Sequence, residues 1–451
     1  MVARCGARAG PMPAVGLLLL CCVMAGCTPD HSVGRSGTPA QVVSPVPTSA
    51  PPAPVPDTPE PTSAPPVSQA EVDRLRALGY LEYDQDVPEP SGKGVVFLDR
   101  DRAQPGYTLV VYASSCRCDL ITLEGGLVNT WSTSPCRRWE FALLLEDGDL
   151  LVVGSDADEA TGADARIAER YLARLAWSGE EVWRRRLPVH HYLELTPQGQ
   201  LMTLLFERRR IAAVDPDIDA VDCSLALLSM DGEVVERMSL YDVVAASRRR
   251  FPLHVSRQGI RGDCCIDLFH SNAVKRVQCS DSTGTNPICA AGNVVVTSRH
   301  QDAVLVVNWP RRELVWFWGP GELSGPHDGS ILADGTLLVF DNGLDRSSSR
   351  IVELDVANGQ LARYAPRDPD FFTRVMGACQ KLPNGNLLIT LTDGCYGIEL
   401  GMDGARAWAY SGVARSPSGR RAKIARMTRI PQATVEAILA RQRTSSGVEG
   451  P

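Results

Sequence analysis

The sequence lacks the patterns that mark several common classes of protein. It has no basic face with interleaved aromatic residues, and its formal net charge is −7, so we expect no nucleic-acid partner. No Cys-x-x-Cys pair is accompanied by histidine at zinc-binding spacing, which argues against a zinc cluster. The apolar run near the N-terminus, residues 15–24, is too short to cross a bilayer.

That apolar run is typical of a targeting signal. Arg4 and Arg8 precede it, and Met24-Ala25-Gly26-Cys27 at its end resembles a bacterial lipobox. We predict a lipoprotein signal peptide over residues 1–26 and a lipid on Cys27; the alternative is a plain secretory signal cut near the same place. The mature chain would then be anchored by lipid to the bacterial outer membrane and face the periplasm or the cell surface.

Composition predicts further segments on either side of the main domain. Residues 27–67 are dominated by Pro, Ser, Thr, Ala and Val, which favours a disordered, extended tether. Residues 68–93 are predicted to form a short helix and a lead-in, because Ser68 is a candidate N-cap with Glu71 three residues on. Residues 431–451 are predicted to form a short helix and a flexible tail.

Turn-and-strand units recur through residues 94–430. Asp-Gly and Asn-Gly pairs, which suit tight hairpin turns, precede apolar and β-branched runs such as residues 336–340 and 387–389. This repetition without intervening helices predicts an all-β propeller. Its chain ends would complete one shared blade, from residues 107–112 and 422–430, which leaves no open edge. A β-sandwich is the alternative, but it would not explain the repeated similar hairpins.

Histidines with polar neighbours recur between residues 190 and 327. They occur as His190-His191, His270-Ser271-Asn272, Ser298-Arg299-His300 and His327-Asp328. In a propeller these motifs would lie on inner strands and their connecting loops, where all could converge on one mouth of the central channel. A single buried histidine is more often a hydrogen-bonded structural group, so it is the set that points to function.

In their order and type, these motifs resemble the bacterial arylsulfotransferases of the PAPS-independent type. The resemblance includes Phe340-Asp341-Asn342-Gly343 and covers about residues 94–410. It implies a six-bladed β-propeller that moves a sulfuryl group from an aryl sulfate donor to a phenolic acceptor. It also implies that no nucleotide donor takes part, and we expect no cofactor.

The resemblance implies that His327 is the transient sulfate acceptor. The other catalytic residues would be His270, Arg299 and His191 or His190, and the candidate substrate-binding residues are Asn272, Asp328 and Asn342. Neutral imidazole is a competent nucleophile, and an arginine can bind two oxygens of the transferred group. His300, next to Arg299 on the predicted strand, is expected to point the opposite way.

The sequence departs from the family pattern at one motif. Where the family commonly reads His-His-Asp, this chain reads His190-His191-Tyr192, and so loses a carboxylate that could fix an imidazole tautomer. Two other functions stay open: a catalytically silent surface propeller that binds a partner, and a metal-dependent hydrolase that uses the same histidines with Asp328 or Asp341. Because a cationic Arg299 beside a divalent metal costs Coulomb energy, we expect no metal.

The cysteines favour an oxidising compartment. Of the 14 cysteines, four lie in the predicted signal or, as Cys27, at its end, and the remaining ten are an even number, which is consistent with disulfides outside the cytoplasm. Cys279 with Cys289, and Cys379 with Cys395, are the two predicted pairs. The sequence leaves the pairing of the other cysteines open.

Overall fold

A computed structural model describes residues 92–134, 136–157, 167–255, 260–261, 265–280, 284–364, 371–417 and 419–445. All of them belong to the unit Pro66–Pro451. The predicted signal peptide with Cys27, the tether, the predicted N-terminal helix with most of its lead-in, and the C-terminal tail lie outside the described residues.

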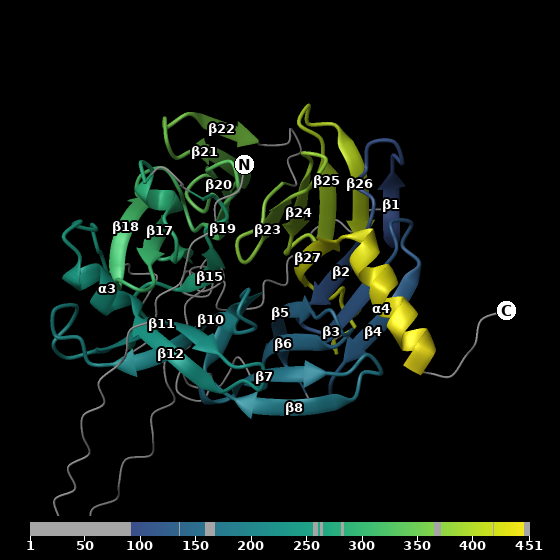
Figure 1. The fold of residues 1–451 in the computed structure, drawn as a ribbon, viewed down its shortest axis with the longest axis horizontal. Helices are drawn as coiled ribbons and strands as arrows, with labels where there is room; N and C mark the ends of the chain where they lie inside the picture. Colours follow the sequence, from purple (N-terminus) through teal and green to yellow (C-terminus); the bar gives the residue numbers. More distant parts are fainter. Residues whose placement is uncertain are drawn as a thin grey trace, which may run out of the picture. The chain divides into compact units, whose positions relative to one another are not determined.

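Six small, mainly antiparallel sheets form a ring, which confirms the six-bladed β-propeller (Figure 1). Blade 1 contains β27 (Ile424–Ile430), β2 (Tyr107–Tyr112), β3 (Arg117–Ile121) and β4 (Leu127–Ser132). Blade 2 contains β5 (Arg138–Leu144), β6 (Leu150–Ser155), β7 (Arg170–Leu175) and β8 (Glu181–Arg186). Blade 3 contains β9 (Val189–Leu195), β10 (Leu201–Arg209), β11 (Asp219–Leu228) and β12 (Val234–Ser239), extended by β14 (Cys265–Asp267) and β13 (Ile260–Arg261).

The second half of the ring repeats the same plan. Blade 4 contains β15 (Ser271–Arg276), β16 (Asn293–Ser298), β17 (Ala303–Asn308) and β18 (Glu313–Trp318). Blade 5 contains β19 (His327–Ile331), β20 (Thr336–Asp341), β21 (Arg350–Asp355) and β22 (Leu361–Tyr364). Blade 6 contains β23 (Ala378–Lys381), β24 (Leu387–Leu391), β25 (Tyr396–Leu400) and β26 (Arg406–Ser411), with β1 (Gly94–Leu98) paired on β26.

The two ends of the propeller close the ring, as the sequence predicts. Strand β2 pairs with β27 antiparallel, from Tyr107 opposite Ile430 to Tyr112 opposite Ile424. This pairing places a strand from the C-terminal end of the chain at the inner edge of the first blade. Hydrogen bonds between β2 and β27 therefore hold the circle shut.

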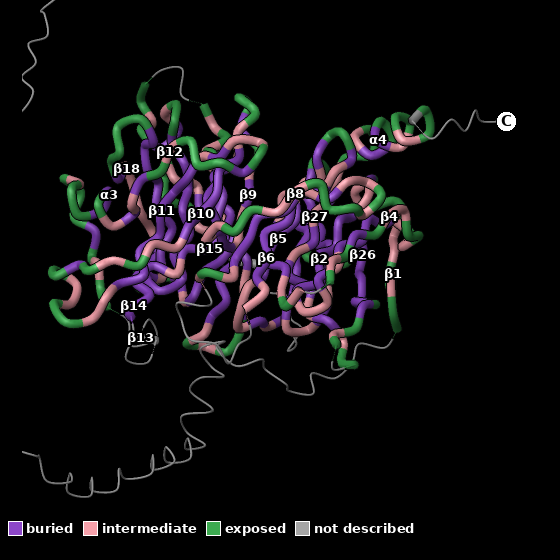
Figure 2. The backbone as a smooth tube through the Cα atoms, turned by 90° about the horizontal axis from the view of Figure 1, so that it is seen from below, coloured by how far each residue is buried: buried purple, intermediate pink, exposed green. Residues whose placement is uncertain are grey.

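Turn chemistry and apolar strands explain why each blade forms. Gly148 and Gly335 follow aspartates and have φ of 96° and 85°, which glycine adopts without strain. Neighbouring blades pack against each other through buried apolar residues. Blades 3 and 4, for example, share one hydrophobic core, which includes Met202, Leu225, Val296 and Leu305. Figure 2 shows the buried interior of the strands and the exposed turns at their ends.

The described part of the chain also contains helices outside the blades. They include α3 (Leu240–Ala246), the 3₁₀ helix η2 (Pro287–Cys289) and α4 (Gln432–Ser445). The last falls in the segment where a short helix is predicted; it buries Val435 and Ile438, and Gln442 Nε2 donates to the Asp147 carbonyl at 3.0 Å. None of the helices in the described part of the chain is long and apolar enough to span a membrane.

The structure contains one predicted disulfide and lacks the other. Cys279 and Cys289 are bonded, with Cα atoms 5.2 Å apart, and a second bond joins Cys116 to Cys136. The predicted pair of Cys379 and Cys395 is wrong, because Cys379 is a buried free thiol. Cys379 belongs to the core shared with blade 5, whereas Cys395 Sγ lies 3.9 Å from the Arg421 carbonyl, next to blade 1. The two side chains thus face opposite sides of blade 6.

Candidate active site

A small cavity lies where the innermost strands of all six blades meet. These strands, β5, β9, β15, β19, β23 and β27, contact one another in sequence around the ring. The cavity has a volume of about 30 Å³. It is lined by Glu140, Phe141, His191, Tyr192, Asn272, His327, Asp328, Met376, Gly377, Ala425 and Arg426. The histidine motifs on separate blades therefore do converge.

His327, the first residue of β19, lines this cavity. Its Nδ1 lies 2.7 Å from Asn342 Oδ1 and 3.0 Å from the Gly325 carbonyl oxygen. Since both neighbours can only accept, we assign the proton to Nδ1, which leaves a lone pair on Nε2. Burial, and next the charge of Arg299, lower the pKa of His327 to about 3. The imidazole is therefore neutral and nucleophilic near neutral pH.

Asn342 fixes the orientation of His327 and does not line the cavity. It is fully buried, and its Nδ2 donates to the carbonyls of Thr373 and Met376, each at 2.9 Å. Ser349 Oγ donates to the Asn342 carbonyl at 2.9 Å. Asn342, which the sequence predicts to bind substrate, thus contacts His327 and two backbone carbonyls in the structure.

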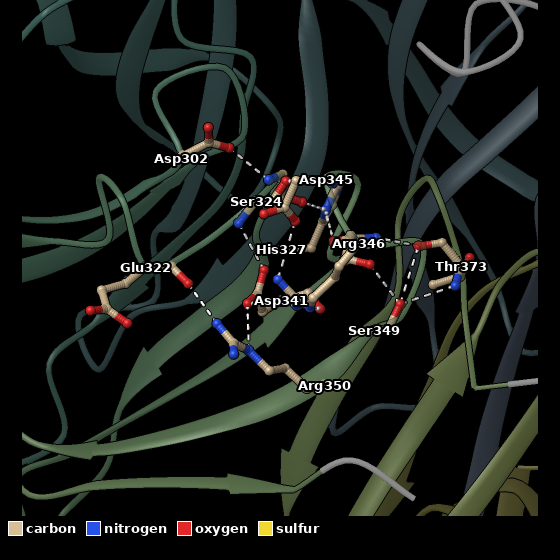
Figure 3. A network of polar contacts seen from close by, with 12 residues as sticks. Asp302, Glu322, Ser324, His327, Asp341, Asp345, Arg346, Ser349, Arg350 and Thr373 are labelled. Atoms are coloured by element: carbon tan, nitrogen blue, oxygen red, sulfur yellow. Dashed lines mark hydrogen bonds and ion pairs between the residues drawn. The ribbon is translucent and has the colours of Figure 1, made fainter. Parts of the chain in front are cut away.

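The loop before His327 is held by a second set of contacts (Figure 3). Asp341 accepts from Ser324 N at 2.9 Å and pairs with Arg346 and Arg350, each at 2.8 Å. Asp302 accepts from Gly325 N at 2.6 Å. The Phe-Asp-Asn-Gly motif thus positions His327. Its aspartate, Asp341, bonds to the loop before His327, and its asparagine, Asn342, bonds to the imidazole ring.

Of the two adjacent histidines on β9, His191 faces the cavity and His190 supports it. His191 has a φ of 61°, and its Nδ1 lies 2.9 Å from His190 Nδ1. The His190 ring stacks on Phe206 with centroids 3.8 Å apart, and its Nε2 lies 3.6 Å from Cys223 Sγ. Burial lowers the pKa of His191 to about 4. This settles the open choice between the two in favour of His191 as the ring at the cavity.

Glu140 on β5 supplies a carboxylate beside this pair, which the sequence did not predict. It accepts from the His191 backbone N–H at 3.0 Å and forms a buried ion pair with Arg170, whose Nε donates to the Val189 carbonyl at 2.7 Å. Burial alone would raise the pKa of Glu140, but the charge of Arg170 holds it well below its usual range. A carboxylate from the neighbouring blade therefore lies near His191, 3.8 Å from its Nδ1, although it bonds the backbone and not the ring. The sequence signal that could have indicated Glu140 is a single glutamate between Trp139 and Phe141 in a buried strand.

His270, Arg299 and His300 form a cluster behind the cavity wall. His270 Nδ1 lies 2.6 Å from Asp267 Oδ2, and its ring meets those of His191 and His300 at centroid distances of 5.5 and 4.6 Å. Arg299 Nη1 lies 3.5 Å from His300 Nε2. Burial lowers the pKa of His270 well below its ordinary value. His270 thus adjoins a ring that lines the cavity.

The prediction that His300 points away from this cluster is wrong. Strand β16 ends at Ser298, so both Arg299 and His300 lie in the turn beyond it, where side chains no longer alternate between two faces. His300 Nδ1 lies 2.7 Å from the Asp267 carbonyl oxygen. Its tautomer is thereby set with the proton on Nδ1.

Asn272 and Asp328 line the cavity, as their predicted role requires, but each is already bonded. Asn272 Nδ2 donates to the Pro326 carbonyl at 2.8 Å. Asp328 Oδ1 pairs with Lys275 Nζ at 2.6 Å and Arg426 Nη1 at 2.7 Å, and its Oδ2 accepts from Cys379 N at 3.0 Å. Burial acts against ionisation of Asp328, but Arg426 and Lys275 keep its pKa below the usual value.

One group of side chains in the described part of the chain could hold a metal ion. It consists of Asp267, His270 and His300, whose ligand atoms lie within 4.8 Å of one another. Asp328 and Asp341, the carboxylates considered in the sequence, are instead paired with cations. A metal-dependent reaction would therefore have to use Asp267 as its carboxylate ligand. The metal ion would then lie close to the positive charge of Arg299, which contacts His300.

Comparisons with known proteins identify the family. Searching the curated proteins gives no match. Among solved structures, a protein of unknown function from Bacteroides caccae is 14% identical with a TM-score of 0.44, over 72% of this chain and 98% of that one. TolB from Acinetobacter baumannii is 11% identical with a TM-score of 0.42, over 72% and 67%. Virginiamycin B lyase from Staphylococcus aureus is 10% identical with a TM-score of 0.39, over 70% and 87%.

At these TM-scores the solved structures say nothing about activity. The family match is more informative, since residues 170–412 fit the model described as Arylsulfotransferase (ASST). The matched segment is more than half of the chain, and it contains His191, His270, Arg299 and His327. The chain therefore belongs to the arylsulfotransferase family.

Proposed function

We propose that this protein transfers a sulfuryl group from a phenolic sulfate ester to a phenolic acceptor through a sulfo-histidine at His327, with no nucleotide donor. One observation carries the proposal. The Nδ1 atom of His327 is held by Asn342 and Gly325, which leaves the lone pair on Nε2, and His327 lines a cavity to which six blades contribute. Family membership supports the general class of reaction.

In the first step, His327 Nε2 attacks the sulfur of the donor. The N–S bond forms while the bond from sulfur to the aryl oxygen breaks, and the first phenolate leaves with the bonding pair. In the second step, the oxygen of the acceptor attacks sulfur, and the N–S pair returns to Nε2. The proton lost by the acceptor phenol balances the proton taken up by the first phenolate. Splitting one transfer into two steps is the general advantage of a covalent intermediate.

The remaining residues act on charge and protons. The transferred group carries charge on three oxygens in a loose transition state, like that of phosphoryl transfer, so fixed cations contribute most. Arg299 is close enough to lower the pKa of His327 and is the cation we assign to this role. His191 is neutral, because its pKa is about 4. It can therefore take the proton from the acceptor phenol or return one to the leaving oxygen.

Turnover of a chromogenic aryl sulfate, measured with and without added phenol, tests this proposal. We expect wild-type turnover to depend on phenol and the His327→Ala variant to lose it. His254→Ala is the matched control, because His254 is exposed and its two hydrogen bonds with Gln301 use only the His254 backbone. A protein mass increased by one sulfuryl group should appear when the donor is added alone, and should be missing in His327→Ala. Full activity of His327→Ala would refute the assignment.

We further propose that the enzyme works outside the cytoplasm on a lipid anchor at Cys27. The lipobox-like motif and the Pro-rich segment after it support this location. In cells supplied with labelled palmitate, the wild-type chain should take up label and sediment with membranes, and Cys27→Ser should do neither. Equal labelling of both proteins would contradict the anchor.

A further inference from the structure

A charged cluster that the mechanism above does not use crosses the central channel. Lys275 lies on β15, Asp328 on β19 and Arg426 on β27, so the three residues come from blades 4, 5 and 1. Lys275 Nζ and Arg426 Nη1 both contact Asp328 Oδ1, at 2.6 and 2.7 Å. Arg426 thus reaches across the channel from the blade that closes the ring.

This cluster carries one more positive charge than negative. Burial would favour neutral Lys275, but the charge of Asp328 raises its pKa above the ordinary value. Asp328 stays ionised, since its pKa is lowered, and an arginine is always charged. Two cations therefore share one carboxylate. An excess charge with little access to water is costly unless a counter-ion arrives.

Arg426 also keeps donors available on the cavity side. A guanidinium has five N–H groups, and the one side-chain hydrogen bond that Arg426 makes to the described residues runs from Nη1 to Asp328. Its Cζ lies 5.3 Å from the ring centre of Phe141 and 5.4 Å from that of Tyr192. Arg426, Phe141 and Tyr192 all line the cavity that contains His327. A cation with spare donors therefore lies against a pair of aromatic rings, Phe141 and Tyr192, whose own centroids are 4.6 Å apart.

We propose that Arg426 is a substrate-binding residue that holds an oxyanion of the substrate in the cavity beside His327. The oxyanion is either the sulfuryl group of the donor or a carboxylate carried by the acceptor. Lys275 neutralises Asp328, so that the charge of Arg426 remains available to the ligand. Phe141 and Tyr192 contact the aryl ring. This inference rests on the proposed function and adds to it a residue outside the histidine motifs.

Equilibrium binding to the full-length His327→Ala protein tests this role without turnover. Calorimetry would compare 4-nitrophenyl sulfate, 4-hydroxybenzoate and phenol as ligands. Adding Arg426→Gln should weaken binding of one anion at least tenfold, roughly the value of a hydrogen bond to a charged group, and leave phenol unchanged. If Arg426→Gln weakens the binding of 4-nitrophenyl sulfate, the group that Arg426 holds is the sulfuryl group. If it weakens only the binding of 4-hydroxybenzoate, the group is the carboxylate.

Matched variants separate binding from folding. Arg276→Gln is the control, since Arg276 lies on the same kind of inner strand, is ion-paired with Glu194 and is outside the cavity lining. Asp328→Asn should have the opposite effect to Arg426→Gln. It should strengthen anion binding severalfold, because it removes the negative charge that Arg426 and Lys275 share. Unchanged binding of both anions in Arg426→Gln, or an equal loss for phenol, would overturn the inference.

The two proposals fail in different ways. If the wild-type protein turns over aryl sulfates but Arg426→Gln binds them normally, the function stands and this role of Arg426 is wrong. If no aryl sulfate is turned over but anion binding still depends on Arg426, the transferase proposal fails and the anion site stands.

Discussion

Replacing Asn342 tests whether the site depends on the orientation and tautomer of His327. Asn342→Ala removes the 2.7 Å contact with His327 Nδ1 and both 2.9 Å bonds to the carbonyls of Thr373 and Met376. The carbonyl of Gly325 still accepts from His327 at 3.0 Å, so the tautomer is weakened rather than inverted. We therefore expect kcat to fall about 10- to 100-fold, as for other partners that orient a reactive histidine.

The same change should cost stability. Three hydrogen bonds of a fully buried side chain are lost, at about 1 kcal/mol each, so unfolding in urea should show a loss of about 3 kcal/mol. Asn342→Asp is the sharper variant. It keeps an acceptor for Nδ1 but places a negative charge beside the ring, which raises the pKa of His327 from about 3.

The pH dependence of kcat separates positioning from simple destabilisation. The reactive form is neutral His327, so wild-type activity should persist until the pH falls towards about 3, as far as the fold survives. In Asn342→Asp the acid limb should move upwards by one or more pH units. Asn358→Ala is the control, because Asn358 is an exposed turn residue bonded to Asp355 at 2.6 Å. Wild-type kcat and an unshifted acid limb in both Asn342 variants would refute the reasoning.

Three other predictions follow from the site. Glu140→Gln leaves Arg170 without its buried partner and should destabilise the fold by about 3 kcal/mol, measured by urea unfolding; an unchanged midpoint would contradict the ion pair's role. The folded pKa values of His191 and His327, about 4 and about 3, lie below the unfolded value of 6.5. The unfolded chain therefore binds more protons below pH 6.5, and each group should cost about 2 kcal/mol of stability between pH 7 and about pH 5. The His327→Ala variant should lack the part of this stability loss that His327 causes. An identical dependence of unfolding free energy on pH in the variant and the wild type would refute this. A chelator should leave phenol-dependent transfer unchanged, whereas its loss and recovery with added divalent metal would favour the group Asp267, His270 and His300.

The propeller itself could be predicted from local sequence. Asp-Gly and Asn-Gly turns before β-branched runs specify hairpins within a few residues, and the repetition of such hairpins specifies a ring of blades. The pairing of residues 107–112 with the C-terminal strand also followed, because a ring without an open edge needs both chain ends in one blade.

The candidate site could be predicted only in part. His327, His191 and Asn272 were named from ordered motifs, and all three line the cavity. Asn342 was named as a substrate-binding residue, whereas in the structure its amide oxygen contacts His327. His300 was misplaced, because the strand ends one residue before Arg299 and alternation stops there.

The sequence alone thus determined the blades, their closure and which motifs carry the histidines, since these depend on turn residues and on spacing along the chain. Only the tertiary structure decided which side chains meet. Glu140 reaches His191 from blade 2, and Arg426 reaches Asp328 across the channel from blade 1. These contacts join residues 51 and 98 positions apart. They are set by the radial packing of six blades, which no local pattern encodes.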